Sequence, residues 1–314
     1  MKEQLDRWTV GDVFVAVTEL NDPNDDHAGI GRIRQYGADL QPKGQITLPQ
    51  TTHLVGGLKF DGNGVLWAFD SHEHIVLNVH RDGRIVRRDF PPRAFSHANF
   101  ARDGSVYLGE HVVGSTIKPE VQARMKTTIS RIPGTDRFGD GHVFRFSADG
   151  RLIKEYATQT DGGLGGFLGV TMSALSPDEK RLVYCSETGP RLMQYDLVED
   201  RQLPDIQNFR PPYPPGPPPM FFGMDYAPDG TLYVLRGGAI HAVDERSGAT
   251  TRELKLDGFG WAIMDIARDG GYAFVGNFFT GAVVKLDLTS GAVLGTIQTG
   301  AAKALAGLVE YQGE

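Results

Sequence analysis

The chain has 314 residues, a formal net charge of -7 at pH 7 and 40% hydrophobic residues, a balance typical of folded proteins rather than disordered acidic chains. No basic run is longer than Arg87-Arg88, which argues against nucleic acid as a partner, because a phosphate-binding surface needs a basic stripe. No stretch approaches the roughly 20 apolar residues of a membrane span, and the charged N-terminus has no signal-peptide core, so we expect no membrane partner and a cytoplasmic location.

The first expected strands cover 12–19 and two segments within 29–46, and they lack an innermost neighbour. From residue 51 onward, one unit recurs five times: an alternating apolar strand, a turn rich in Asp, Asn and Gly, and a second apolar strand. Pairs such as Asn63-Gly64 suit these turns because glycine accepts positive φ. The first hairpins of the five units span 57–69, 97–109, 173–185, 224–235 and 264–276.

A second hairpin follows each of these, so that one unit holds four antiparallel strands over about 40 residues, the length of a propeller blade. We therefore predict an all-β, six-bladed β-propeller with four-stranded antiparallel blades, in one domain over 1–314. A β-sandwich is the alternative, but it does not predict five equivalent hairpins. The strand missing from the first blade is supplied by ALAGLVEY (304–311), which closes the ring. The expected blades are 12–50 with 300–314, 51–90, 93–156, 167–203, 220–254 and 260–298.

The long connections of such a ring should all lie on the face where the innermost strands begin. They are 20–29, 157–169 and two larger insertions, 111–140 and 203–220, which we expect to act as lids over a central mouth. The alternative is insertion at tolerant surface sites. In the first insertion, an amphipathic helix is expected from the apolar spacing of Val121, Met125, Ile129 and Ile132.

Histidines concentrate at the predicted mouth of the second and third blades. In one interpretation, His97, Glu110 and His111 form a catalytic acid–base group, since imidazole moves protons near neutral pH and a carboxylate can orient it. A second reading treats these histidines as solvated or structural hydrogen-bonding residues.

A third interpretation is a divalent metal site. Its candidate ligands are two or three histidines, above all His53, His72 and His74 but also His97 and His111, with Glu110 as an additional one, and His72 and His74 would share one face of a strand. No cofactor other than this metal ion is proposed.

Further residues at the strand ends are candidates for binding a small-molecule substrate. Arg236 and Asn277 could hold a carboxylate or carbonyl group, and the aromatic side chains could form an apolar wall. The alternative for each is a solvated or packing role. The full set is Glu19, Asp70, Thr171, Glu187, Tyr213, Phe221, Phe222, Arg236, Trp261 and Asn277.

The repeated pattern xxFxxDGxLYV resembles the SMP-30/gluconolactonase-like, NHL-like and virginiamycin B lyase-like six-bladed propellers. Resemblance to the lactonase group implies a calcium ion held by Glu, Asn or Asp before each innermost strand. Resemblance to the lyase-like group implies that mouth histidines act as bases, a role that His97 and His111 would suit. The positions that match the lactonase ligands are Gly56, Ser96, Thr171, Phe222 and Ala262, which include no carboxylate and no Asn and so argue against that calcium.

These observations lead to two functional hypotheses. The first is an enzyme that acts on a small, largely apolar organic molecule in the central mouth by proton transfer. Its reaction would be hydrolysis or ring-opening of an ester or lactone, or an elimination or isomerisation. The second is a non-catalytic propeller that binds a small ligand or a protein through its decorated face.

Overall fold

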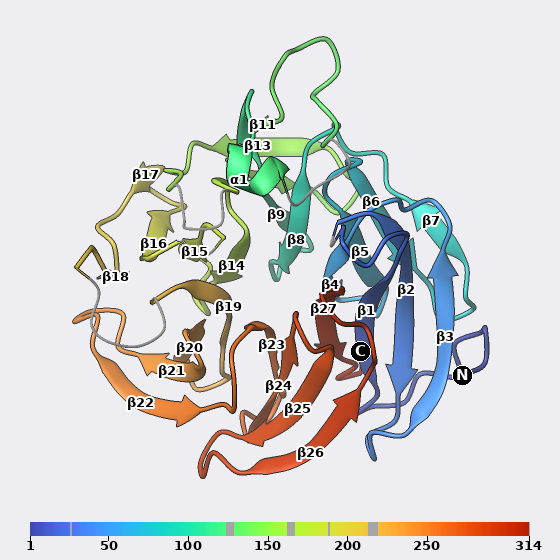
Figure 1. Cartoon of the computed structure of the whole chain (residues 1–314). Coiled ribbons are helices and arrows are strands. Elements are labelled where there is room, and N and C mark those ends of the chain that lie inside the picture. The colour runs from blue at the N-terminus through green and yellow to red at the C-terminus, as the bar shows by residue number, and fades with distance from the viewer. Residues whose placement is uncertain (26, 124–128, 162–166, 188, 213–218, 314) are drawn as a thin grey trace.

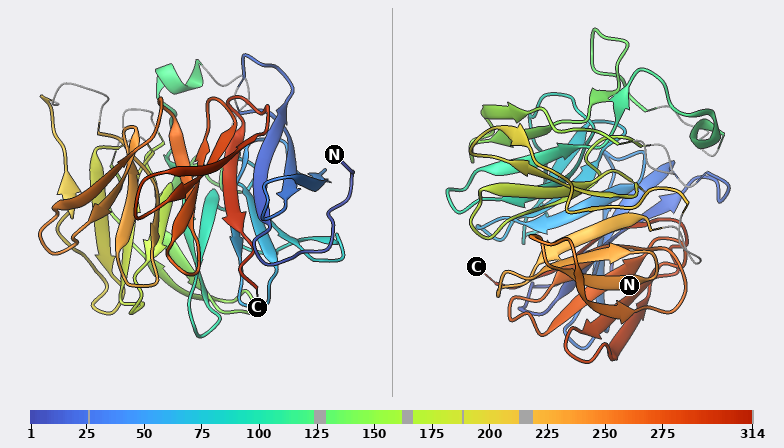
Figure 2. Two further views of the ribbon diagram at one scale, coloured as in Figure 1. Left: turned by 90° about the horizontal axis from the view of Figure 1, so that it is seen from below. Right: turned by 90° about the vertical axis from the view of Figure 1, so that its left-hand side faces the viewer.

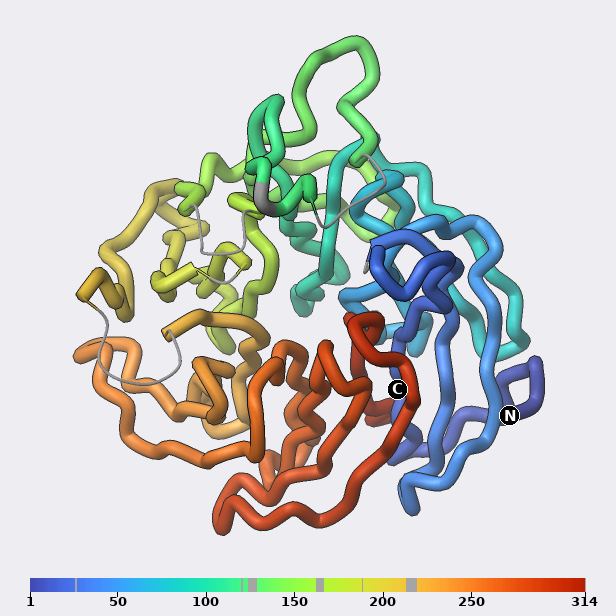
Figure 3. The backbone as a smooth tube through the Cα atoms, viewed as in Figure 1, coloured from blue at the N-terminus to red at the C-terminus, as the bar shows by residue number. Residues whose placement is uncertain are grey.

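The computed structural model describes residues 1–25, 27–123, 129–161, 167–187, 189–212 and 219–313. Six antiparallel sheets surround a common axis, and each forms one blade of four strands paired side by side (Figures 1 and 3). The prediction of an all-β, six-bladed propeller is thus confirmed. No helix in the described ranges is long and apolar enough to cross a bilayer.

The first blade joins the two ends of the chain. Its strand order is β27-β1-β2-β3, with β27 innermost. The register pairs Val13 with Glu310 and Val17 with Leu305, which confirms the predicted closure by the C-terminal strand. The strands are β1 (Val13–Leu20), β2 (Gly29–Tyr36), β3 (Pro42–Leu48) and β27 (Leu305–Glu310).

The other five blades follow the chain from the innermost strand outward. The second and third blades hold β4 (Val55–Phe60), β5 (Leu66–Asp70), β6 (Ile75–Val79) and β7 (Ile85–Arg87), then β8 (Phe95–Phe100), β9 (Val106–Glu110), β12 (Val143–Phe146) and β13 (Leu152–Tyr156). The fourth blade holds β14 (Met172–Leu175), β15 (Arg181–Cys185), β16 (Arg191–Asp196) and β17 (Arg201–Gln202). The last two hold β19 (Phe221–Tyr226), β20 (Leu232–Arg236), β21 (Ala239–Val243) and β22 (Thr250–Lys255), then β23 (Trp261–Ile266), β24 (Tyr272–Asn277), β25 (Ala282–Asp287) and β26 (Val293–Gln298).

Among the described residues, three short strands, β10 (Val113–Gly114), β11 (Gly139–Asp140) and β18 (Gln207–Asn208), and one helix lie outside this plan. In the 111–140 insertion, β10 pairs with β11, and α1 (Pro119–Gln122) forms a single turn. The predicted amphipathic helix does not extend to Ile129 and Ile132, which lie in irregular backbone, and Met125 lies outside the described residues. Ile129 is instead buried with Val121 in a small apolar cluster of the insertion.

The apolar core lies between neighbouring blades. One cluster, for example, joins Tyr107 and Val143 of the third blade to Leu182 and Tyr184 of the fourth. At the axis the innermost strands crowd together, and Gly57 in β4 has φ +64° with its missing Cβ position only 2.0 Å from the carbonyl oxygen of Ser96. A side chain there would push β4 and β8 apart. Seen from the side, α1 and the β1–β2 loop project from the same face of the ring (Figure 2), where the functional site is found.

Candidate functional site

A cavity of about 220 Å³ opens at the axis of the ring, on the face that carries α1 and the β1–β2 loop. Every blade contributes to its wall, since the innermost strands begin here and the loops that follow the second strands turn inward. Most of the wall is apolar, and the polar groups gather on the side of the second to fourth blades. The lining residues include His27, His72, Ser96, His111, Phe167, Thr171, Glu187, Phe222, Phe259 and Phe279.

Aromatic rings hold the histidines of the cavity in place. His27 stacks on His72 with ring centroids 5.4 Å apart, and Phe167 lies 4.6 Å from the ring of His111. The sequence did not mark His27 as a candidate for the mouth, yet it lines the cavity. His27 lies in the 20–29 loop, which contacts the neighbouring second blade: the Leu54 amide donates a hydrogen bond to the His27 carbonyl at 3.0 Å.

His111 lies between a hydroxyl and a carboxylate. Its Nδ1 is 3.1 Å from Thr171 Oγ1, and its Nε2 is 3.4 Å from Glu187 Oε2. Burial, followed by the nearby imidazoles of His27 and His97, lowers the pKa of His111 to about 3. The imidazole is therefore neutral at physiological pH and keeps one basic nitrogen. Thr171, Glu187 and His111, which were all predicted from their positions at strand ends, lie together in the wall of the cavity.

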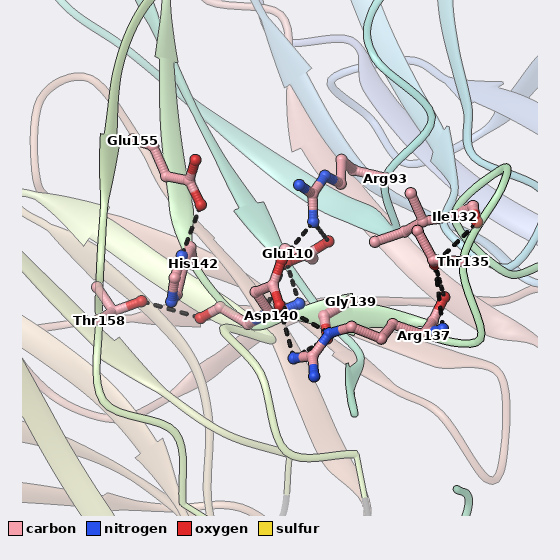
Figure 4. Close-up of polar contacts among 11 residues, drawn as sticks. Arg93, Glu110, Ile132, Thr135, Arg137, Gly139, Asp140, His142, Glu155 and Thr158 are labelled. Carbon is pink, nitrogen blue, oxygen red and sulfur yellow. Dashed lines mark hydrogen bonds and ion pairs between the residues drawn. The ribbon is translucent and has the colours of Figure 1, made fainter. Parts of the chain in front are cut away.

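Glu110 does not take the predicted place beside His97 and His111. Its fully buried carboxylate accepts hydrogen bonds from the amides of Asp140 (2.7 Å) and Gly141 (2.8 Å), and it lies 3.3 Å from the Arg93 guanidinium (Figure 4). Arg93 also pairs with Asp140 at 2.7 Å. Glu110 therefore fastens the end of the 111–140 insertion to β9, directly next to His111.

His97 lies deeper in the ring, below the mouth cavity. Its Nδ1 is 2.9 Å from Ser96 Oγ and its Nε2 is 2.5 Å from Ser173 Oγ. Gly109 lies opposite His97 in the register, and a Cβ on that glycine would meet His97 Cε1 at 2.5 Å, so the glycine makes room for the ring. His97 lines a second, smaller cavity of about 60 Å³ along the axis. A direct role in catalysis stays a prediction.

Burial lowers the pKa of His97 to about 4 from an ordinary value of 6.5. Between these pH values the unfolded chain binds a proton that the folded chain does not, so stability falls as the pH falls. We expect the free energy of unfolding to drop by about 2 kcal/mol more in the wild type than in His97→Asn when the pH falls from about 7 to about 5. Urea unfolding at both pH values measures this. Equal pH dependence in the two proteins would contradict the neutral buried imidazole, and a large loss of turnover at unchanged stability would favour catalysis.

The proposed metal ligands do not come together as expected. Residues 71–74 form a turn instead of a strand, and His74 has φ +54°, so the alternation that would place His72 and His74 on one face does not apply. His53 does lie near His72, with ring centroids 4.9 Å apart. Within the described part of the chain, no three His, Cys, Asp or Glu side chains are placed to hold a metal ion. The arrangement of these residues does not support the predicted ligand set, and metal binding itself stays a prediction.

Two more predicted site residues have structural partners. Asp70 is buried, which raises its pKa, and it accepts hydrogen bonds from the amides of Thr52, His53 and Glu73. It therefore shapes the loops around the histidines. Glu19 is exposed and pairs with Arg32 at 2.7 Å, away from the mouth cavity.

The fifth and sixth blades place only some of their candidates in the wall. Phe222 lines the cavity, whereas Phe221 and Trp261 are buried in the core. Asn277 supports the wall indirectly, because it donates to the Phe259 carbonyl and accepts from the Phe279 amide. Both of those phenylalanines line the cavity rim.

The two insertions differ in their relation to the mouth. The first packs Val121, Ile129 and Phe138 against Phe167, and so covers the wall beside His111. The second forms β18 (Gln207–Asn208), which pairs with β16 in the fourth blade. Its Gln207 accepts a hydrogen bond from Arg236 at 2.7 Å, so Arg236 holds this link and does not line the cavity. Tyr213 lies outside the described residues, and no described residue of 203–220 lines the cavity.

No known protein family matches the sequence, and no curated protein matches it either. Among solved structures, the chain is similar to a catalytically inactive histidine-to-alanine variant of virginiamycin B lyase from Staphylococcus aureus with quinupristin. The TM-score is 0.55 at 14% identity, over 94% of this chain and 92% of that one. It is also similar to a chain of the nidogen/laminin complex, with a TM-score of 0.60 at 11% identity over 96% and 98% of the two chains. At these identities the likeness shows the propeller fold, in agreement with the predicted resemblance.

Proposed function

We propose that this protein is an enzyme that acts on a small, largely apolar organic molecule in the mouth cavity, with His111 as its general base. The supporting observation is the placement of a neutral imidazole between Thr171 and Glu187 in the wall of an apolar cavity. A buried base next to a carboxylate that orients it is a common catalytic arrangement. The distant likeness to a lyase agrees with this proposal but does not carry it.

The cavity selects for apolar ligands. Phe69, Phe167, Phe222 and Phe278 line it together with Met172, so a ligand gains binding energy mainly by burying hydrocarbon surface. The few polar groups face it from one side, which would orient the reacting carbon toward His111. The reactions that fit are ester or lactone hydrolysis, elimination and isomerisation.

The test compares wild type with His111→Asn on a panel of aryl esters, lactones and substrates for base-catalysed elimination. We expect turnover of the active substrate to fall by about 10²–10⁴-fold in the variant, because the base is lost. Leu286→Ala, a core change in β25 of the sixth blade at a residue that does not line the cavity, serves as a control for general destabilisation. Full activity in His111→Asn would overturn the proposal.

The pH dependence of kcat/KM provides a second test of His111 as the base. With a pKa of about 3, His111 stays unprotonated across the neutral range, so kcat/KM should show no acidic limb between about pH 5 and 8. An acidic limb near the ordinary histidine value of about 6.5, lost in His111→Asn, would contradict a neutral buried base.

Non-catalytic binding of a small ligand or a protein is the second candidate function. Phe259 and Phe279 at the cavity rim are each more than two-fifths exposed and stack with centroids 5.7 Å apart. Exposed aromatic pairs often anchor partner proteins. Tight binding of apolar ligands without turnover of any panel member would favour a binding role over catalysis.

A further inference from the structure

Ser96 and Thr171 both place a hydroxyl group in the wall of the mouth cavity, but the two hydroxyls have different hydrogen-bond partners. Ser96 Oγ contacts His97, but the far nitrogen of His97 meets the hydroxyl of Ser173, at 2.5 Å, and no carboxylate. Ser96 Oγ also lies 3.0 Å from the carbonyl oxygen of Thr171, which competes for its proton. At Thr171 the sequence of groups is different: hydroxyl, imidazole of His111, carboxylate of Glu187.

The positions of the protons on the Thr171 hydroxyl and the His111 imidazole follow from the chemistry of the groups beside them. An ionised carboxylate only accepts hydrogen bonds, so the imidazole proton of a neutral His111 is best placed on Nε2, which faces Glu187 at 3.4 Å. Nδ1 then carries the lone pair, and the Thr171 hydroxyl, 3.1 Å away, must donate to it. A hydroxyl that donates to a base oriented by a carboxylate is the arrangement that activates a nucleophile.

The fold presents Thr171 to the cavity. It lies immediately before β14 (Met172–Leu175), and its own amide is bonded to the Cys185 carbonyl at 3.0 Å. Its backbone is therefore held by the sheet of the fourth blade while its side chain lines the cavity. The thiol of Cys185 is not a rival nucleophile, since burial raises its pKa to about 12 and the side chain is fully buried.

We propose that Thr171 is a covalent nucleophile and that the substrates are carboxylic esters or lactones with an apolar acyl chain. This inference rests on the proposed function, because it needs His111 as the base. Thr171 Oγ1 forms a bond to the carbonyl carbon while its proton passes to His111 Nδ1. Collapse of the tetrahedral adduct breaks the ester C–O bond, and His111 returns the proton to the leaving alkoxide.

Water completes the cycle. His111 takes a proton from a water molecule that attacks the acyl-threonine, the bond to Thr171 Oγ1 breaks, and the hydroxyl regains its proton from His111. The net reaction consumes one ester and one water and yields one acid and one alcohol; with a lactone both groups stay on one molecule. Glu187 stays ionised throughout and stabilises the imidazolium that forms in each half-reaction.

The experiment uses p-nitrophenyl esters of butyric and hexanoic acid and an alkyl fluorophosphonate probe. The wild type should hydrolyse the esters and take up one probe molecule, with Thr171 as the labelled residue in peptide mass spectrometry. Thr171→Val keeps the shape but removes the hydroxyl, and should lose labelling and about 10²–10⁴-fold in turnover. Thr171→Ser should keep labelling, and Thr231→Val, a matched loss of a threonine hydroxyl in the β19–β20 turn outside the cavity, should keep both labelling and turnover.

The outcomes separate this inference from the proposed function. If Thr171→Val hydrolyses esters like the wild type while His111→Asn does not, the covalent role is overturned and the general base stands. If both variants keep full activity, both proposals fail. Absence of ester hydrolysis and of labelling in the wild type also overturns the covalent inference, whatever reaction His111 supports.

Discussion

Removal of residues 300–314 is expected to abolish cooperative unfolding. β27 provides the innermost strand of the first blade, and its segment buries Leu305, Leu308, Val309 and Tyr311. At about 1.5–3 kcal/mol for each large apolar side chain, the loss is roughly 6–12 kcal/mol, as large as the whole stability of a typical domain, about 5–15 kcal/mol. Circular dichroism during heating would show a broad, non-cooperative change in place of a sharp transition.

Two further proteins make this result specific to the ring closure. Deletion of residues 313–314 alone leaves β27 and Tyr311 in place and should melt like the wild type. Addition of a peptide of residues 300–314 to the truncated chain should restore a cooperative transition, because the vacant inner strand position pairs with β1. A truncated protein with unchanged melting would show that β27 does not close the ring.

The fold could be predicted because its information is local. Each blade carries its own alternating strands and turn pairs, such as Asp103-Gly104 and Asp269-Gly270, where both glycines have positive φ. Five copies of a short-range pattern, with one incomplete copy split between the two ends of the chain, leave little choice of architecture. The closure followed by elimination, since only one apolar strand remained for the blade that lacked one.

The site was predicted only where a side chain belongs to a strand end. His111, Thr171 and Glu187 were placed at the cavity because strand direction determines the face on which a strand ends. The direction of Glu110 could not be derived in the same way, because Glu110 is the last residue of β9 and His111 follows the end of the strand, where alternation no longer applies. In the structure, Glu110 meets Arg93.

Residues that reach the cavity from loops escaped prediction. His27 arrives in the 20–29 loop and Phe167 in the link between the third and fourth blades. A loop has no regular period from which the direction of a side chain can be derived. The prediction for His72 and His74 was wrong for the same reason, because it assumed the alternation of a strand where residues 71–74 form a turn. Because the long connections were predicted on the face of the mouth, their residues could have been included as candidate site residues together with those at the strand ends.

Glu110→Ala is expected to lower the free energy of unfolding by about 3 kcal/mol, because it leaves the buried amides of Asp140 and Gly141 without their acceptor. Arg93 keeps Asp140 as a partner, which limits the loss. Glu155→Ala is the matched control in the same blade: that carboxylate is two-fifths exposed and pairs only at the surface with His142 (Figure 4), so its loss should cost less than about 1 kcal/mol. Urea unfolding measures both.

The same variant tests whether Glu110 positions the neighbouring His111. The Glu110 carbonyl accepts the Val170 amide at 2.8 Å, and the His111 carbonyl accepts the Gly169 amide at 3.0 Å, so a loosened insertion end moves the backbone that carries the base. Turnover should then fall in Glu110→Ala even at temperatures where it is fully folded, and recover in part in Glu110→Gln, which keeps one acceptor oxygen. Reduced stability with unchanged turnover per folded molecule would limit Glu110 to a structural role. A residual rate whose pH profile matches the wild type would show that the base itself is unaltered and only its placement has changed.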